Sequence, residues 1–209
     1  VVGGTGLYFK ALTDGLVKIP EIPVNIKIQA EKLHNKMGQE LFFKQLNDLD
    51  PLTKKFISPS DVQRSIRAYE VKKFTNESLF NLIKETKSNF NDLTFKKLFI
   101  NTPKDVLYDT IEERVEKMFQ DGAIEEVKMF LKMKIYRELS ANKIIGIKEI
   151  REFLRGRETL KNTKELITQK TKQYVKRQFT WSRGHMKSWE MIYSPNIKDL
   201  FEKAINKIS

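Results

Sequence analysis

Val1-Val2-Gly3-Gly4-Thr5-Gly6 opens the chain with two β-branched residues, a run of small residues and then an apolar helical pattern. This order predicts the end of a buried strand that turns sharply into a helix over about residues 7–16. A strand that enters a helix through a glycine turn is typical of α/β proteins. Because a strand cannot be stable as the first two residues of a domain, we expect the chain to be a piece of a longer protein. The turn itself either holds a phosphate at the helix N-terminus or is no more than a tight turn.

The rest of the chain is predicted to be mostly helical, with strands only at Phe95–Ile100 and Trp189–Tyr193. Ser58-Pro59-Ser60-Asp61 predicts a helix cap. The expected helices cover about residues 24–36, 39–46, 51–56, 62–74, 79–87, 107–121, 127–131, 148–154, 163–181 and 197–208.

The scarcity of strands predicts an α/β core interrupted by an all-helical insertion. Residues 1–23 and 91–209 form the expected core, and residues 24–90 the expected helical lobe. Pro20, Pro23 and the polar stretch 88–92 are the expected hinges. The lobe is expected to have a small core of its own, made of Phe42, Phe43, Leu46 and Phe56.

Composition narrows the function classes. The 39 Lys and Arg residues against 27 Asp and Glu give a net charge of +12, which favours an anionic partner, although lysine-rich chains also arise from nucleotide composition. There is no cysteine and there are only two histidines, His34 and His185, which argues against thiolate or His-based catalysis and metal binding. No apolar run approaches about 18 residues, so we expect no membrane partner. The absence of cysteine fits a reducing compartment, and we expect a cytoplasmic protein.

Lys176-Arg177-Gln178-Phe179-Thr180-Trp181-Ser182-Arg183 combines cations, amide, hydroxyls and two aromatic rings. Cations neutralise phosphates and aromatic faces stack on unpaired bases, so this cluster predicts RNA binding. The alternative is an amphipathic helix whose cations are solvated and whose aromatic rings are buried. For Trp181 we favour burial in the core, because it ends an apolar helical pattern.

Three segments, taken in order, resemble the bacterial tRNA dimethylallyltransferases (IPP transferase family). Residues 2–8 match that family's "VGGTGLY", residues 50–71 its "DP…I.P.D.QR..RALEV", and residues 171–183 its "TRQYAKRQ.TWFR". Residues 122–127 and 143–149 follow its "G..EEV" and "AIGYKE". The departures keep charge or bulk: Lys172 and Lys104 stand for Arg, Ile147 for Tyr, and Tyr69 for Leu. The family's P-loop "GPTASGKS" and its "DS.Q.Y" segment with the general-base Asp are not among the 209 residues.

The resemblance implies a P-loop nucleotide-kinase-like core with a helical inserted lobe. It implies transfer of a dimethylallyl group from dimethylallyl diphosphate to N6 of adenine 37, in tRNAs that read codons beginning with U. The expected partners are dimethylallyl diphosphate and the anticodon stem-loop, whose adenine leaves its stack to react. Mg²⁺ is the expected cofactor at the diphosphate. We expect a monomer, and no activity from these 209 residues alone, since the P-loop and the base are missing from them.

By the same resemblance, Thr5 is the expected catalytic residue and also contacts tRNA; the alternative is a helix N-cap. Lys27 contacts tRNA or is only a solvated surface charge, and Arg67 contacts tRNA or pairs with Glu70 or Asp61. Arg114 is a candidate for binding the diphosphate. The remaining expected tRNA contacts are Gln63, Arg64, Ser65, Ile66, Lys143, Ile144, Ile145, Gly146, Ile147, Lys148, Lys176, Arg177, Gln178, Phe179, Thr180, Trp181, Ser182 and Arg183.

Two other functions stay open at this point. The chain could be a non-catalytic tRNA-binding remnant of such an enzyme. It could also be a P-loop small-molecule kinase, although a kinase has no need for the aromatic and basic cluster at 176–183 or for so large a helical insertion.

Overall fold

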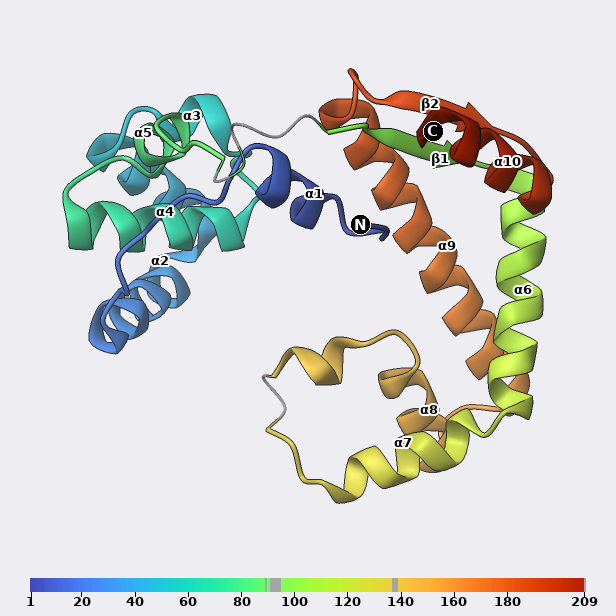
Figure 1. Cartoon of the computed structure of the whole chain (residues 1–209). Helices are drawn as coiled ribbons and strands as arrows, with labels where there is room; N and C mark the ends of the chain where they lie inside the picture. The colour runs from blue at the N-terminus through green and yellow to red at the C-terminus, as the bar shows by residue number, and fades with distance from the viewer. Residues whose placement is uncertain (89, 91–94, 137–138, 209) are drawn as a thin grey trace. The chain divides into compact units, whose positions relative to one another are not determined.

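The computed structural model describes residues 1–88, 90, 95–136 and 139–208 (Figure 1). The chain separates into two compact units, one formed by residues 1–6 with 95–209 and the other by residues 7–94. The predicted domain limits at residues 23/24 and 90/91 stay predictions. The second of these limits and most of the predicted hinge at 88–92 involve residues outside the described part of the chain.

The unit of residues 7–94 is helical wherever it is described as regular structure. Its elements are α1 (Gly6–Thr13), α2 (Val24–Leu49), α3 (Thr53–Phe56), α4 (Val62–Thr75) and α5 (Leu79–Lys84). The predicted break between two helices is present as a kink inside α2 at Gly38, whose φ of 76° lies in the left-handed region. The first predicted helix is shorter than expected, because the chain leaves it at Thr13.

The core of this unit lies between α2 and α4. Its buried residues are Ala30, Phe42, Phe43, Leu46, Ile57, Ala68 and Tyr69. The predicted cap is confirmed: the Asp61 carboxylate accepts a hydrogen bond of 3.0 Å from the Arg64 N–H at the start of α4. The prediction that Phe56 joins this core is wrong. Its side chain is 54% exposed and stacks on Phe80, while the next residue, Ile57, takes the buried place.

The other unit contains a small parallel sheet and several helices. Its elements are β1 (Leu98–Asn101), α6 (Lys104–Gln120), α7 (Ala123–Lys132), the short 3-10 helix η1 (Ser140–Lys143), α8 (Ile147–Leu154), α9 (Leu160–His185), β2 (Glu190–Tyr193) and α10 (Ile197–Ile208). β1 and β2 pair in parallel, with Leu98 opposite Glu190. Both predicted internal strands are therefore confirmed. The predicted strand at Val1–Val2 is wrong: both residues are almost fully exposed, and in the described residues no strand lies beside them.

α9 and α6 run side by side from the sheet to the α7–α8 end of this unit (Figure 1). Two salt bridges cross between them, from Lys164 to Glu116 and from Lys172 to Glu112. A second apolar core forms where α6, α7, α8 and α9 meet. Its buried residues are Val115, Ala123, Val127, Ile147, Ile150 and Ile167. The fold is thus mostly helical with a small parallel sheet, in agreement with an α/β class.

None of the helices in the described ranges combines the length and the apolar character that crossing a membrane requires.

Candidate functional site

The N-terminal glycine turn lies directly on α9. The Gln178 side-chain amide donates a hydrogen bond of 2.9 Å to the carbonyl oxygen of Gly4. At Gly6 a Cβ atom would lie only 2.1 Å from two ring carbons of Trp181. Neither glycine has a positive φ. At Gly6 the absence of a side chain is therefore required for close approach to α9, and not for a special backbone conformation.

Thr5 sits between these two contact points. It is exposed, and its hydroxyl forms no hydrogen bond with any residue that the structure describes, so the alternative of a helix cap is not realised. A free hydroxyl is thus held in place by its two neighbours, Gly4 and Gly6, rather than by a bond of its own. It is available to a ligand, as the predicted role requires; that role itself stays a prediction.

The two aromatic rings of the cluster at residues 176–183, Phe179 and Trp181, are only partly buried. Trp181 stacks on His185 with ring centroids 4.4 Å apart, and Phe179 meets Phe99 edge-on at 6.0 Å. Trp181 belongs to neither apolar core. The expectation that it is a core residue is therefore wrong: its partly buried ring lies against Gly6 and stacks on His185, outside both cores.

The cations at the C-terminal end of the same helix have no carboxylate partner in the described part of the chain, whereas Lys164, Lys170 and Lys172, nearer its start, form salt bridges. Lys176, Arg177 and Arg183 are exposed, and within the described part of the chain none of them forms a salt bridge. Arg177 lies 5.7 Å from the ring centroid of Tyr174. The hydroxyls of Thr180 and Ser182 are different, since each donates to a carbonyl one turn back in the helix. The free groups at this end of α9 are therefore the three cations.

The predicted contact segment Lys143–Lys148 is tied to α9 by a buried carboxylate. Glu149 accepts a hydrogen bond of 2.8 Å from the N–H of Gly146 and forms a salt bridge with Lys170 of α9. Gly146 has φ 107°, which favours glycine. Burial raises the pKa of Glu149, but the hydrogen bonds from Lys170 and the backbone, with the Lys170 charge, outweigh it and lower the pKa below its ordinary value.

Within this segment the side chains divide by exposure. Lys143, Ile144 and Lys148 are exposed, whereas Ile145 and Ile147 pack into the second core. The segment therefore presents two cations and one apolar side chain to solvent.

The other predicted tRNA contacts lie on the helical unit. Gln63 and Arg64 are exposed, and Arg64 pairs with Asp61 at 3.1 Å. Arg67 pairs with Glu70 at 3.1 Å, which realises the structural alternative without excluding a contact. The remaining positions are less accessible: Ser65 is buried, Ile66 packs on the core, and Lys27, in the first turn of α2, is half-buried.

Arg114 is not brought to the glycine turn. It is exposed on α6, whose opposite side carries Glu112 and Glu116 toward α9. A diphosphate contact by Arg114 stays a prediction.

Sequence reasoning missed His185. It lies four residues after Trp181, the spacing that brings two side chains together on a helix, and this signal could have identified it as the stacking partner.

A search of the described ranges finds no group of three or more His, Cys, Asp or Glu side chains that could hold a metal ion.

Residues 1–185 match the family model described as IPP transferase. The chain belongs to the IPP transferase family. It is 47% identical over all 209 residues to the tRNA dimethylallyltransferase of Pelagibacter ubique, and 35% identical to that of Rickettsia typhi. The chain spans about two thirds of the length of these relatives, 66% and 67% respectively.

Solved structures show the same fold. A structure titled as a eukaryotic dimethylallyltransferase acting on tRNA matches 98% of this chain and 54% of its own, with a TM-score of 0.75 at 21% identity. The full-length tRNA isopentenylpyrophosphate transferase of Bacillus halodurans matches 98% of this chain and 64% of its own, with a TM-score of 0.54 at 25% identity.

Proposed function

We propose that this chain contributes the RNA-binding part of an enzyme that transfers a dimethylallyl group from dimethylallyl diphosphate to N6 of adenine 37 in tRNA. The names of its relatives support this proposal, since eight curated relatives of 34–47% identity are each called tRNA dimethylallyltransferase. The tRNAs concerned are those that read codons beginning with U, and the partner is the anticodon stem-loop.

One observation in this chain carries the proposal: a free hydroxyl and free cations gather at one end of α9. Gln178 and Trp181 seat the glycine turn that presents Thr5, and the adjacent Lys176, Arg177 and Arg183 have no carboxylate partner in the described ranges. Cations bind the RNA backbone without reading its sequence. An adenine that leaves its stack needs polar and flat partners where it reacts, which Thr5 and the aromatic side chains can offer.

These residues have distinct roles in the proposed reaction. Lys176, Arg177 and Arg183 hold the RNA backbone, and the Thr5 hydroxyl hydrogen-bonds close to the reacting adenine. Glu149 fixes the segment at residues 143–148 against α9, so that Lys143 and Lys148 meet the same RNA. The exocyclic amine is a poor nucleophile, so a general base must take its proton; the family resemblance assigns that role to an Asp outside the 209 residues.

We also propose that β1 and β2 belong to the sheet of a P-loop core. Parallel sheets are normally covered on both faces. Ile100, Met191 and Tyr193 of this sheet are half-exposed or more, which supports additional covering structure. In such a protein the P-loop would bind the diphosphate. Mg²⁺ would neutralise it, held mainly by phosphate oxygens, since this chain's described residues offer no metal cluster. A monomeric, cytoplasmic protein remains our expectation.

The experiment compares two RNAs of equal length and composition: an anticodon stem-loop with an unpaired adenine at position 37, and a self-complementary strand that forms a fully paired duplex. We expect the 209-residue chain to bind the stem-loop more tightly at the same salt concentration. Equal affinity for the two RNAs would contradict the proposal.

Transfer activity is tested separately. With dimethylallyl diphosphate, Mg²⁺ and the stem-loop, the 209-residue chain is expected to form no modified adenine, because the phosphate cradle and the base are not among its residues. Modified adenine formed by this chain would contradict the proposal that it supplies RNA binding while the P-loop and the general base lie outside its 209 residues.

A further inference from the structure

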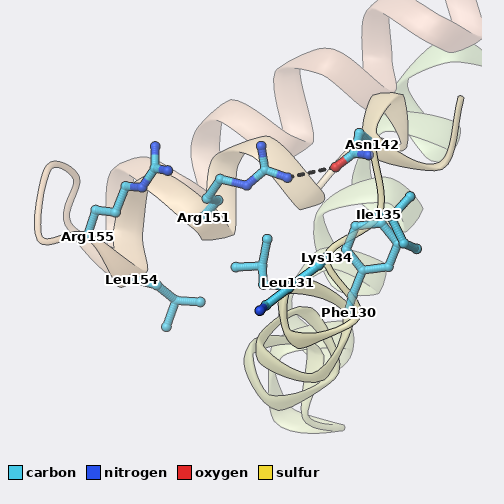
Figure 2. Close-up of a pocket in the computed structure, with 8 residues that line it drawn as sticks. All are labelled: Phe130, Leu131, Lys134, Ile135, Asn142, Arg151, Leu154 and Arg155. Carbon is cyan, nitrogen blue, oxygen red and sulfur yellow. Dashed lines mark hydrogen bonds between the residues drawn. The ribbon is translucent and has the colours of Figure 1, made fainter. Parts of the chain in front are cut away.

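A cationic pocket of about 330 Å³ lies between α7 and α8, and nothing in the proposed function uses it. Figure 2 shows Lys134 reaching from the end of α7 toward Leu154, with Arg151 and Arg155 one helical turn apart along α8. The lining residues are Phe130, Leu131, Lys134, Ile135, Asn142, Arg151, Leu154 and Arg155. Among the described residues that line it there are three cations and no carboxylate.

The side chain of Arg151 has one donor without an acceptor in this pocket, among the residues that the structure describes. One of its terminal nitrogens donates a hydrogen bond of 2.9 Å to the side-chain oxygen of Asn142. Its Nε atom is buried and has no hydrogen-bond partner among the described residues. Cations near a helix C-terminus stabilise the helix dipole, but that effect does not require a buried, unpaired donor. An anion beside Nε would accept the missing hydrogen bond. Its attraction to the guanidinium charge would be stronger than in water, because the site is partly buried.

The other two cations differ in their partners. Arg155 already pairs with Glu152 at 2.9 Å, so its charge is partly neutralised. Lys134 is exposed and forms no salt bridge within the part of the chain that is described, and its φ of 49° places it at a turn just after α7. Arg151 and Lys134 are therefore the two groups free to bind an anion.

We propose that this pocket binds a phosphate group, and that its source is the backbone of the RNA. The choice of source rests on the proposed function. Asn142, which lines the pocket, directly precedes the segment 143–148 that we expect to touch tRNA. RNA lying along that segment would carry a phosphate into reach of Arg151. The site would add affinity without sequence preference, since phosphate contacts position a nucleic acid but do not read it.

The test follows the Nε–H signal of Arg151 by NMR in the unmodified 209-residue chain, with Arg151→Lys used only to assign the signal. The anticodon stem-loop is added in one titration and inorganic phosphate in another. We expect the stem-loop to shift the signal strongly, and inorganic phosphate to shift it only at much higher concentration. A shift with inorganic phosphate alone would support a free phosphate as the source. A signal that neither ligand moves, while the chain binds the stem-loop, would overturn the proposal.

Affinity provides a second readout. Lys134→Gln removes one phosphate contact, so the slope of log K against log salt should become shallower by about 0.7–0.9. Lys161→Gln is the matched control, because Lys161 is an exposed lysine on α9 that does not line the pocket, and it should leave the slope unchanged. Equal slopes for both variants and the unmodified chain would contradict an RNA source. If the unmodified chain does not bind the stem-loop at all, the proposed function fails, and the phosphate titration still decides the pocket.

Discussion

Gly6→Ala is the substitution whose effect follows most directly from the structure. The added methyl carbon would lie 2.1 Å from Cε3 and Cζ3 of Trp181, more than an ångström short of ordinary contact, which begins at 3.4 Å. The indole ring is not free to retreat, since it stacks on His185 at 4.4 Å. Either the ring turns out of this stack or residues 1–6 leave α9.

Overpacking of this kind costs about 1–3 kcal/mol. The free-energy cost cannot exceed the energy of the contacts that hold residues 1–6 on α9, because the segment would otherwise detach from the helix. One hydrogen bond, from Gln178 to Gly4, contributes about 0.5–1.5 kcal/mol of that, and contact with the indole ring contributes the rest. We therefore expect Gly6→Ala to lower the free energy of unfolding by about 1–2 kcal/mol.

The assay is equilibrium unfolding in urea, with hydrogen exchange of residues 1–6 as a local readout. Gly184→Ala is the control, since Gly184 is on α9 with no atom within 4 Å of an added Cβ. It should be neutral or stabilising by up to about 1 kcal/mol, as alanine favours helix. In a Trp181→Ala background the cost of Gly6→Ala should disappear. The same cost in both backgrounds would refute the reasoning, because the ring would then not be its cause.

Three further predictions concern stability. The pKa of Glu149 is below its ordinary 4.5, so the stabilisation that its carboxylate provides is present above pH 4.5 and is lost as the pH falls through the lowered pKa. Glu149→Gln should therefore reduce the loss of unfolding free energy, measured in urea, between neutral and acid pH. Phe42→Ala should cost about 3–5 kcal/mol, since Phe42 is fully buried, whereas Leu41→Ala at an exposed position should change stability by less than about 0.5 kcal/mol in the same assay. Asp61→Ala should cost about 1 kcal/mol by removing the cap of α4, measured by thermal unfolding, and an unchanged melting temperature would contradict this role.

Features with local causes could be predicted from the sequence. The start of α4 was predicted because its cap is local: the Asp61 carboxylate bonds the N–H of Arg64, three residues along the chain. Both bounds of α10 agree with those predicted from its periodic apolar pattern. The kink at Gly38 agrees with the predicted break between the helices at residues 24–36 and 39–46, since glycine there is also a local signal. Phe56 shows the limit of such patterns: at the end of a single helical turn, one residue decides which side chain is buried, and Ile57 takes that place.

Features with distant causes could not be predicted. The Gly4–Gln178 contact joins residues 174 positions apart, so no local signal distinguishes glycines needed for close approach from glycines of a turn. The valines at the start resembled a strand, but a strand requires a neighbour, and the chain's described sheet contains only β1 and β2. The candidate site was found by family resemblance in its residues, whereas its geometry, with Trp181 beneath Gly6 and Glu149 holding the segment at 143–148, came only from the structure.

The most direct test of the RNA-binding account is the salt dependence of stem-loop binding in a double variant, Lys176→Ala with Arg177→Ala. Both side chains are exposed and free of salt bridges in the described ranges, so stability should hardly change. Two lost phosphate contacts should weaken binding and reduce the slope of log K against log salt by roughly 1–2. A control pair of exposed lysines, Lys117→Ala with Lys132→Ala, should leave the slope unchanged. Unchanged affinity and slope in the Lys176 and Arg177 variant would contradict the account and leave this end of α9 as a solvated helix face.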